Sequence, residues 1–154
     1  MSKEKLPGRI AGIDYGTVRI GIAITDPARS FASPLEQFTR GDPAAETRYF
    51  QHLAKEEAVS LFVVGLPIHL SGEESQKSHE ARQWAKWLGE TTGVPVELFD
   101  ERFTTAQADE ALAAGELTSK QRKKRRDMLA AQAMLSGYLE AVRGREASNE
   151  AIDD

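Results

Sequence analysis

Four acidic residues stand where strands or helices are expected to begin or end. Asp14 closes a short apolar run, Asp100 and Glu101 follow another, and Asp127 begins an amphipathic segment. Strand ends and helix starts meet at one edge of an α/β sheet, so we expect these side chains to converge. Two carboxylates about 4 Å apart repel by about 4 kcal/mol at an effective dielectric constant near 20. A cluster of three carboxylates therefore needs a bound proton or a divalent cation to offset this repulsion.

A cluster of carboxylates is suited to binding hard metal ions. The chain has no cysteine and no evident histidine cluster, so its ligands would be oxygen atoms, which favour Mg²⁺ or Mn²⁺ over zinc. Two such ions about 3.5–4 Å apart allow water to attack a phosphodiester while the leaving oxygen is stabilised. The acids thus predict a nuclease of the two-metal-ion type.

Each acid also has a simpler explanation. Asp127 would be favourable in the first turn of any helix because of the helix dipole, and Asp100 or Glu101 would be ordinary in a solvated loop. Asp14 is harder to explain in this way. Strand alternation places it on the same face as Ile10 and Gly12, where an unpaired charge is costly.

A basic segment directly precedes Asp127. The chain carries a net charge of −4, yet six of the seven residues from 120 to 126 are positive. These residues are Lys120, Arg122, Lys123, Lys124, Arg125 and Arg126. Such a segment can hold a phosphate backbone without reading its sequence, and the simpler alternative is a solvated charged loop.

The pattern of apolar residues predicts an α/β fold with mixed strand pairing. Strands are expected over 9–14, 18–26, 30–38, 60–67 and 94–100, the first two joined by a hairpin turn at 15–17. Helices are expected over 43–58, with Asp42 as N-cap, and over 73–91, 104–115 and 127–142. This order predicts a five-stranded sheet of an antiparallel meander and two parallel strands, with helices on both faces.

Length and composition bound the remaining possibilities. The 154 residues predict one domain over 1–143, followed by a flexible acidic tail over 144–154. No run approaches the roughly 20 apolar residues that span a bilayer, so no membrane partner is expected. We predict a cytoplasmic protein, as monomer or homodimer, with nucleic acid as partner.

Four motifs in order resemble one known family. The stretches GIDYGTVRIGIAITDP, VVGLPIHLSG, DERFTTAQA and RRDMLAAQAMLSGYL are similar to the bacterial YqgF family, also called RuvX. That family comprises pre-16S rRNA nucleases and Holliday-junction-resolvase-like proteins, and the resemblance runs from about residue 9 to residue 142. It implies a ribonuclease-H-like fold and metal-dependent cleavage of nucleic acid, associated with 5′-end maturation of pre-16S rRNA.

The resemblance also assigns residues. It places an acidic catalytic and metal-binding triad on Asp14, Glu101 and Asp127, with Asp100 as a supporting acid. Arg19, Arg102 and His69 join the basic segment as further candidates for nucleic-acid contact. One departure concerns the loop after the fourth strand, where His69 and Ser71 replace the amide and the acid usual in the family.

Three other functions are compatible with parts of the sequence. The same acids could serve a DNA nuclease, including one that cuts Holliday junctions, although RNA is the expected polymer. A non-catalytic ribosome-assembly or transcription-associated binding module could use the same fold. The GID-x-GT motif also resembles the phosphate-binding hairpin of actin-like ATPases and sugar kinases, but the chain contains no other Asp-x-Gly loop.

Overall fold

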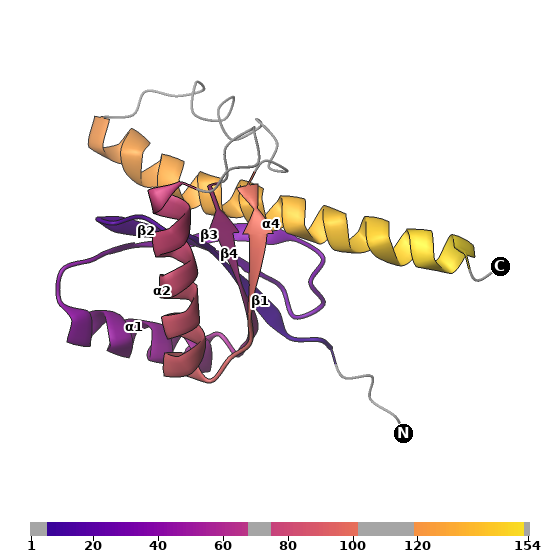
Figure 1. The fold of residues 1–154 in the computed structure, drawn as a ribbon, viewed down its shortest axis with the longest axis horizontal. Coiled ribbons are helices and arrows are strands. Elements are labelled where there is room, and N and C mark those ends of the chain that lie inside the picture. Colours follow the sequence, from indigo (N-terminus) through magenta and orange to yellow (C-terminus); the bar gives the residue numbers. More distant parts are fainter. Residues whose placement is uncertain (1–5, 68–74, 102–118, 153–154) are drawn as a thin grey trace.

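The computed structural model describes residues 6–67, 75–101 and 119–152 and contains five strands and three helices within these ranges. The elements, in chain order, are β1 (Arg9–Asp14), β2 (Arg19–Thr25), β3 (Ala32–Thr39), α1 (Pro43–Glu56), β4 (Val59–Leu66), α2 (Gln76–Thr92), β5 (Val96–Asp100) and α4 (Ser119–Ile152). Figure 1 shows their arrangement around the sheet. The expected helix over 104–115 lies outside the described residues.

The sheet has the order β3-β2-β1-β4-β5. β1 pairs with β2, and β2 with β3, in antiparallel fashion, whereas β4 runs parallel to both β1 and β5. This confirms the predicted meander followed by two parallel strands. The central position of β1 explains its buried apolar residues, since it has neighbours on both sides and helices over both faces.

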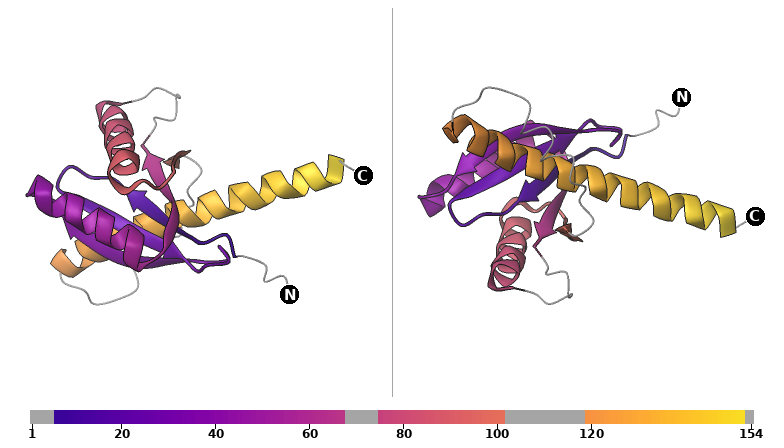
Figure 2. Two further views of the ribbon diagram at one scale, coloured as in Figure 1. Left: turned by 90° about the horizontal axis from the view of Figure 1, so that it is seen from below. Right: turned by 90° about the horizontal axis from the view of Figure 1, so that it is seen from above.

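One face of the sheet is covered by α1 and α2, and the other by α4 (Figure 2). Strand alternation divides the residues of β1 between the faces: Ala11 and Ile13 pack toward α1 and α2, and Ile10 packs toward α4. α4 approaches β1 closely at Gly12, where an added Cβ atom would lie 2.8 Å from the Cβ atom of Leu135. Glycine is therefore required for this approach.

The helix ends follow the local chemistry of their sequences. Asp42 caps α1 by accepting a hydrogen bond from the backbone of Ala44, as predicted, and Pro43 follows it. Ser75 caps the start of α2, and Gly93, in the left-handed conformation, caps its end after Thr92. Among the described residues, none of the helices combines the length and apolarity needed to cross a membrane.

The last helix is longer than the sequence analysis predicted. α4 begins at Ser119 rather than Asp127, so the basic segment belongs to the helix, and it continues to Ile152 through most of the expected flexible tail. Lysine, arginine, alanine and glutamate are good helix formers, and extending an existing helix adds one hydrogen bond per residue. Gly144 is accommodated within α4, which extends beyond the sheet at its C-terminal end (Figure 1).

Candidate functional site

Asp14 is the last residue of β1 and stands at the carboxyl end of the strand. It is half-buried and lies opposite Gly21 of β2 in the antiparallel register. Alternation places its position on the face of Ile10 and Gly12, which is the face that α4 covers. This is the placement that the sequence analysis predicted for Asp14.

Glu101 reaches the same place from the end of β5. Between β1 and β5 lies β4, whose Gly65 makes room for the glutamate side chain. An added Cβ atom at Gly65 would lie 2.5 Å from Oε1 of Glu101, which is closer than a Cβ atom approaches any other non-bonded heavy atom. Any larger residue at position 65 would displace the carboxyl group, so Gly65 is part of the site. Sequence analysis missed this role, although a glycine within an apolar, β-branched strand is a known sign of close approach.

The carboxyl groups of Asp14 and Glu101 share a hydrogen bond. Such a bond needs a proton on one of the two groups, because two ionised carboxylates only accept. Burial raises the pKa of Glu101, and the negative charge of Asp100 raises it further, whereas the bond to Asp14 and the charge of Lys77 act in the opposite direction. The structure therefore joins Asp14 and Glu101 in one half-buried acidic pair.

The acidic pair has the donor set that a hard divalent cation prefers. Both groups offer carboxylate oxygens, and a cation would neutralise the repulsion that a shared proton otherwise relieves. Among the side chains that the structure describes, no group of three or more His, Asp or Glu residues could hold a metal ion. Asp100, the predicted supporting acid, does not complete such a group, and its charge acts on Glu101 from the end of β5.

Asp127 lies on α4, one helical turn before Ala131, which is buried against the sheet. Leu135, one turn further, is the residue that contacts the position of Gly12. The backbone thus brings the helix that carries Asp127 across the strand that carries Asp14. The placement of the Asp127 side chain lies outside the described features, so its membership of the triad stays a prediction.

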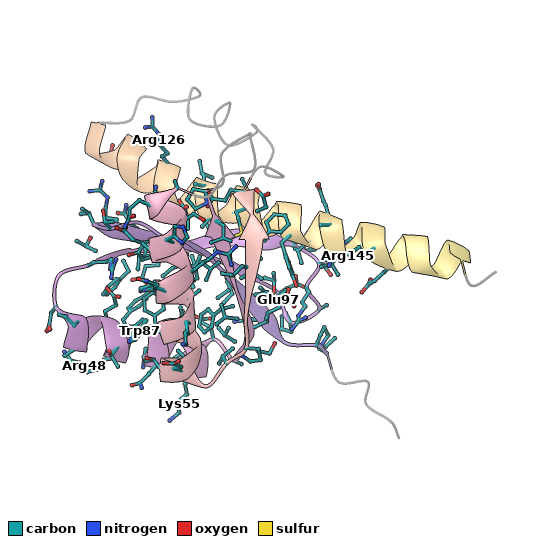
Figure 3. All side chains as sticks on the ribbon, in the orientation of Figure 1. Arg48, Lys55, Trp87, Glu97, Arg126 and Arg145 are labelled. Carbon is teal, nitrogen blue, oxygen red and sulfur yellow. The ribbon has the colours of Figure 1, made fainter. Side chains whose placement is uncertain are left out.

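The basic residues from 120 to 126 occupy the N-terminal turns of α4. Of these, Arg126 has a described side chain, which is exposed (Figure 3). His69 and Arg102, which were predicted to contact nucleic acid, lie outside the described residues.

An open groove of about 560 Å³ lies beside the hairpin turn that follows Asp14. Arg19, a predicted nucleic-acid contact, lines this groove, and so does Lys77 from the first turn of α2. Lys77 is close enough to Glu101 to lower its pKa, which places the lysine near the acidic pair. Sequence analysis missed Lys77, because no local pattern links the first turn of α2 to the ends of β1 and β5.

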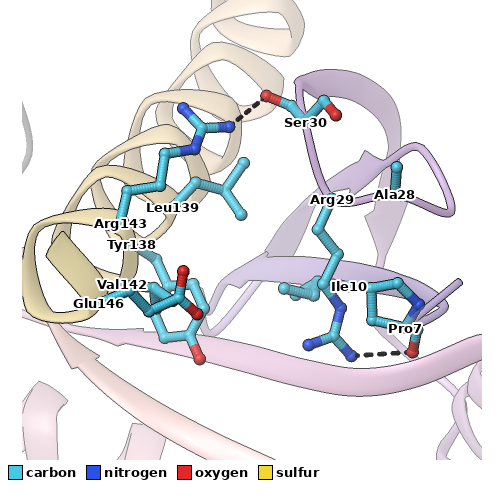
Figure 4. Close-up of a pocket in the computed structure, with 10 residues that line it drawn as sticks. All are labelled: Pro7, Ile10, Ala28, Arg29, Ser30, Tyr138, Leu139, Val142, Arg143 and Glu146. Atoms are coloured by element: carbon cyan, nitrogen blue, oxygen red, sulfur yellow. Dashed lines mark hydrogen bonds between the residues drawn. The ribbon is translucent and has the colours of Figure 1, made fainter. Parts of the chain in front are cut away.

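A second cavity, of about 330 Å³, lies at the other end of the sheet between the β2–β3 connection and α4 (Figure 4). Arg29 and Arg143 approach it from opposite walls, and Ile10 and Leu139 contribute apolar surface. Arg143 donates a hydrogen bond to the backbone carbonyl of Ser30. None of the predicted catalytic or nucleic-acid-binding residues lines this cavity.

A family profile and two relatives of known sequence match most of this chain. A family profile described as "RuvX: Holliday junction resolvase" matches residues 8–141. A protein of Rhodopirellula baltica is 49% identical over 96% of this chain and 91% of its own length. A protein of Koribacter versatilis is 35% identical over 86% of this chain and 87% of its own length. Both carry the name "Putative pre-16S rRNA nuclease".

Solved structures with the same fold include two proteins in complex with a Holliday junction. RuvC of T. thermophilus in complex with a Holliday junction substrate aligns with a TM-score of 0.52 at 18% identity, over 87% of this chain and 96% of that chain. The fowlpox virus resolvase in complex with Holliday junction DNA aligns with a TM-score of 0.53 at 12% identity, over 87% of this chain and 98% of that chain. At these identities the likeness establishes the fold, which is the predicted ribonuclease-H-like α/β fold.

Proposed function

Because the chain belongs to the RuvX family, we propose that it is a metal-dependent nuclease that hydrolyses phosphodiester bonds during 5′-end maturation of pre-16S rRNA. The observation that supports this proposal is the half-buried acidic pair of Asp14 and Glu101 at the carboxyl ends of β1 and β5. Two carboxyl groups held this close together lower stability when both are ionised, so their presence needs a functional reason.

In this proposal Asp14, Glu101 and Asp127 hold Mg²⁺ or Mn²⁺, with Asp100 in a supporting role. When bound, two such ions supply an activated water and stabilisation of the leaving oxygen. The chain's own residues hold the carboxylates in place: Gly65 admits Glu101, and the close contact at Gly12 sets α4 against β1.

The substrate backbone is proposed to lie between the groove and the start of α4. Arg19 and Lys77 line the groove beside the turn after Asp14, and the basic segment from 120 to 126 lies on the helix that carries Asp127. Contacts between such cations and phosphates position a nucleic acid without selecting its sequence. Binding is therefore expected to weaken steeply as salt concentration rises.

The test is a cleavage assay on the full chain. RNA with a 16S 5′ extension, single-stranded DNA and four-way DNA junctions are each incubated with Mn²⁺, with Mg²⁺ and with chelator. We expect cleavage of the RNA with either ion and none with chelator. Asp14→Asn should lower the rate by about a thousandfold, equivalent to about 4 kcal/mol of transition-state stabilisation.

The matched control is Glu90→Gln, which removes an exposed carboxylate near the far end of α2 and should leave the rate unchanged. Cleavage that persists in chelator or in Asp14→Asn would contradict the proposal. Preferred cleavage of the four-way junction would identify a DNA resolvase instead. Binding to RNA without cleavage in any condition would favour the non-catalytic module.

A further inference from the structure

The turn that follows Asp14 is held at both ends by a single residue, Arg40. The backbone N–H of Arg40 donates to the carbonyl of Val18 at 2.9 Å. Its guanidinium donates to the hydroxyl of Tyr15 at 2.9 Å and to the carbonyl of Gly16 at 3.2 Å. Arg40 directly follows β3, so the end of one strand fixes the connection between two others.

Arg40 is itself held by a buried carboxylate from α1. Its Nε donates to Oε1 of Glu46 at 2.8 Å and its Nη2 to Oε2 at 3.2 Å, and the side chain of Glu46 is 9% exposed. The indole of Trp84 on α2 also donates to Oε2, at 2.9 Å. Such a two-point contact between arginine and carboxylate fixes orientation as well as distance.

Tyr15 is anchored on the opposite face of the sheet from Asp14. Its ring centroid lies 5.4 Å from that of Trp84, and the guanidinium carbon of Arg40 lies 5.1 Å from the centre of the Tyr15 ring. Adjacent residues of a strand point to opposite faces. Holding Tyr15 against α1 and α2 therefore turns the preceding residue toward α4 and Glu101.

We propose that Arg40 and Glu46 are positioning residues for the active site, because through Tyr15 they set the direction in which Asp14 presents its carboxylate. Neither residue is proposed to touch substrate or metal. The catalytic consequence rests on the proposed nuclease function. Misplacing one reacting group by about 1 Å can slow an enzyme by about a hundredfold.

The chain offers a matched ion pair for comparison. Arg9 donates to Glu57 at 2.7 Å and joins the start of β1 to the residue after α1. Both pairs link arginine to glutamate and connect the sheet to α1, but the Arg9–Glu57 pair lies at the end of β1 remote from Asp14. The Arg40–Glu46 pair is the more deeply buried of the two, so Arg40→Gln is expected to lose more stability, and kcat separates the two roles. A role in stability alone leaves the kcat of the folded protein unchanged in both arginine variants, whereas a positioning role lowers kcat in Arg40→Gln alone.

The experiment compares Arg40→Gln with Arg9→Gln in the full chain, at a temperature at which thermal unfolding shows both to be folded. We expect Arg40→Gln to lower kcat by about tenfold to a hundredfold, with KM for the nucleic acid changed less than about threefold. Hydrogen exchange at residues 15–18 should accelerate in Arg40→Gln. Arg9→Gln should leave kcat and this exchange unchanged.

A milder pair of variants serves if Arg40→Gln does not fold. Tyr15→Phe removes the hydroxyl that Arg40 contacts, and Tyr49→Phe removes a comparable hydroxyl that donates to Glu36 at 2.6 Å. We expect kcat to fall in Tyr15→Phe and to stay unchanged in Tyr49→Phe. Equal losses of kcat within either pair, or an unchanged kcat in both Arg40→Gln and Tyr15→Phe, would overturn the positioning role.

The nuclease proposal can fail while the positioning role of Arg40 still holds, and the two outcomes can be distinguished. If the unaltered protein cleaves no substrate, the nuclease proposal fails, and the positioning role is then decided by hydrogen exchange and by calorimetric titration with Mn²⁺. Faster exchange at residues 15–18 and weaker Mn²⁺ binding in Arg40→Gln, but not in Arg9→Gln, would support positioning of Asp14. Identical exchange and Mn²⁺ binding in the two variants would overturn it.

Discussion

Charged side chains are arranged differently at the two ends of β1. At the amino end, Arg9 pairs with Glu57, and the Arg29 guanidinium donates to backbone carbonyls of the segment before the strand. At the carboxyl end, Asp14 and Glu101 bring two acidic groups together. The first arrangement pairs charge with its complement, as stability requires, whereas the second keeps like charges close. The difference is what the proposed function predicts, with the carboxyl end serving chemistry and the amino end serving folding.

The largest effect is expected from a substitution that fills the space beside Glu101 and so disturbs the acidic pair at the carboxyl end of β1. Gly65→Ala would place a Cβ atom 2.5 Å from Oε1 of Glu101, so the carboxyl group must move. We expect kcat to fall by about a hundredfold, because the displaced carboxylate no longer faces Asp14. Gly41→Ala is the control, since no atom lies within 4 Å of its added Cβ atom. A steady-state cleavage assay decides, and equal activity of the two variants would mean that the acidic pair does not need this geometry.

Asp14→Asn should lower the rate of cleavage but raise the stability of the folded protein near neutral pH. Burial raises the pKa of Glu101, so the folded protein holds this proton more tightly than the unfolded chain does. The stability of the unaltered protein in chelator should therefore fall as pH rises above the ordinary pKa of glutamate, through the raised value. When the carboxyl groups of Asp14 and Glu101 are both ionised they repel each other, and Asp14→Asn removes one of the two like charges, so this variant should be more stable near neutral pH, by about 1 kcal/mol.

Urea unfolding at a series of pH values measures this effect. Arg9→Gln provides the opposite case, because it removes a complementary charge and should lower stability at neutral pH. If Asp14→Asn instead destabilises the protein as Arg9→Gln does, the acidic pair stabilises the fold, and the contrast between the two ends of β1 is wrong.

The sequence predicted the parts of this arrangement that depend on local patterns. Two short apolar runs joined by a Gly-Thr turn located β1 and β2, and Asp42 followed by proline located the start of α1. Asp14 was identifiable because a charge at that position conflicts with the pattern around it. Such conflicts between local pattern and residue type are expected at functional sites.

The remaining parts depend on contacts between distant segments. The space beside Gly65 becomes significant only when β5 is known to bring Glu101 against β4, and the sequence contains no local sign of that pairing. The contacts of Arg40 similarly form only when the end of β3, the turn after β1 and the helix α1 come together in the fold. The start of α4 was misplaced because an acid such as Asp127 favours a first helical turn, yet the basic residues before it are equally able to continue a helix.

The smallest expected effect lies at the amino end of β1, where Arg29 adopts a φ of 58° in the left-handed region. Arg29→Ala and Arg29→Gly both lose the bonds from Nε to the Gly8 carbonyl at 2.9 Å and from Nη2 to the Ser60 hydroxyl at 3.0 Å. Only glycine also relieves the backbone strain, so we expect Arg29→Gly to be the more stable of the two by about 1 kcal/mol in urea unfolding. Cleavage should be unchanged in both, because this end of the strand serves folding. A loss of kcat comparable to that of Gly65→Ala would show instead that the two ends of β1 act together in catalysis.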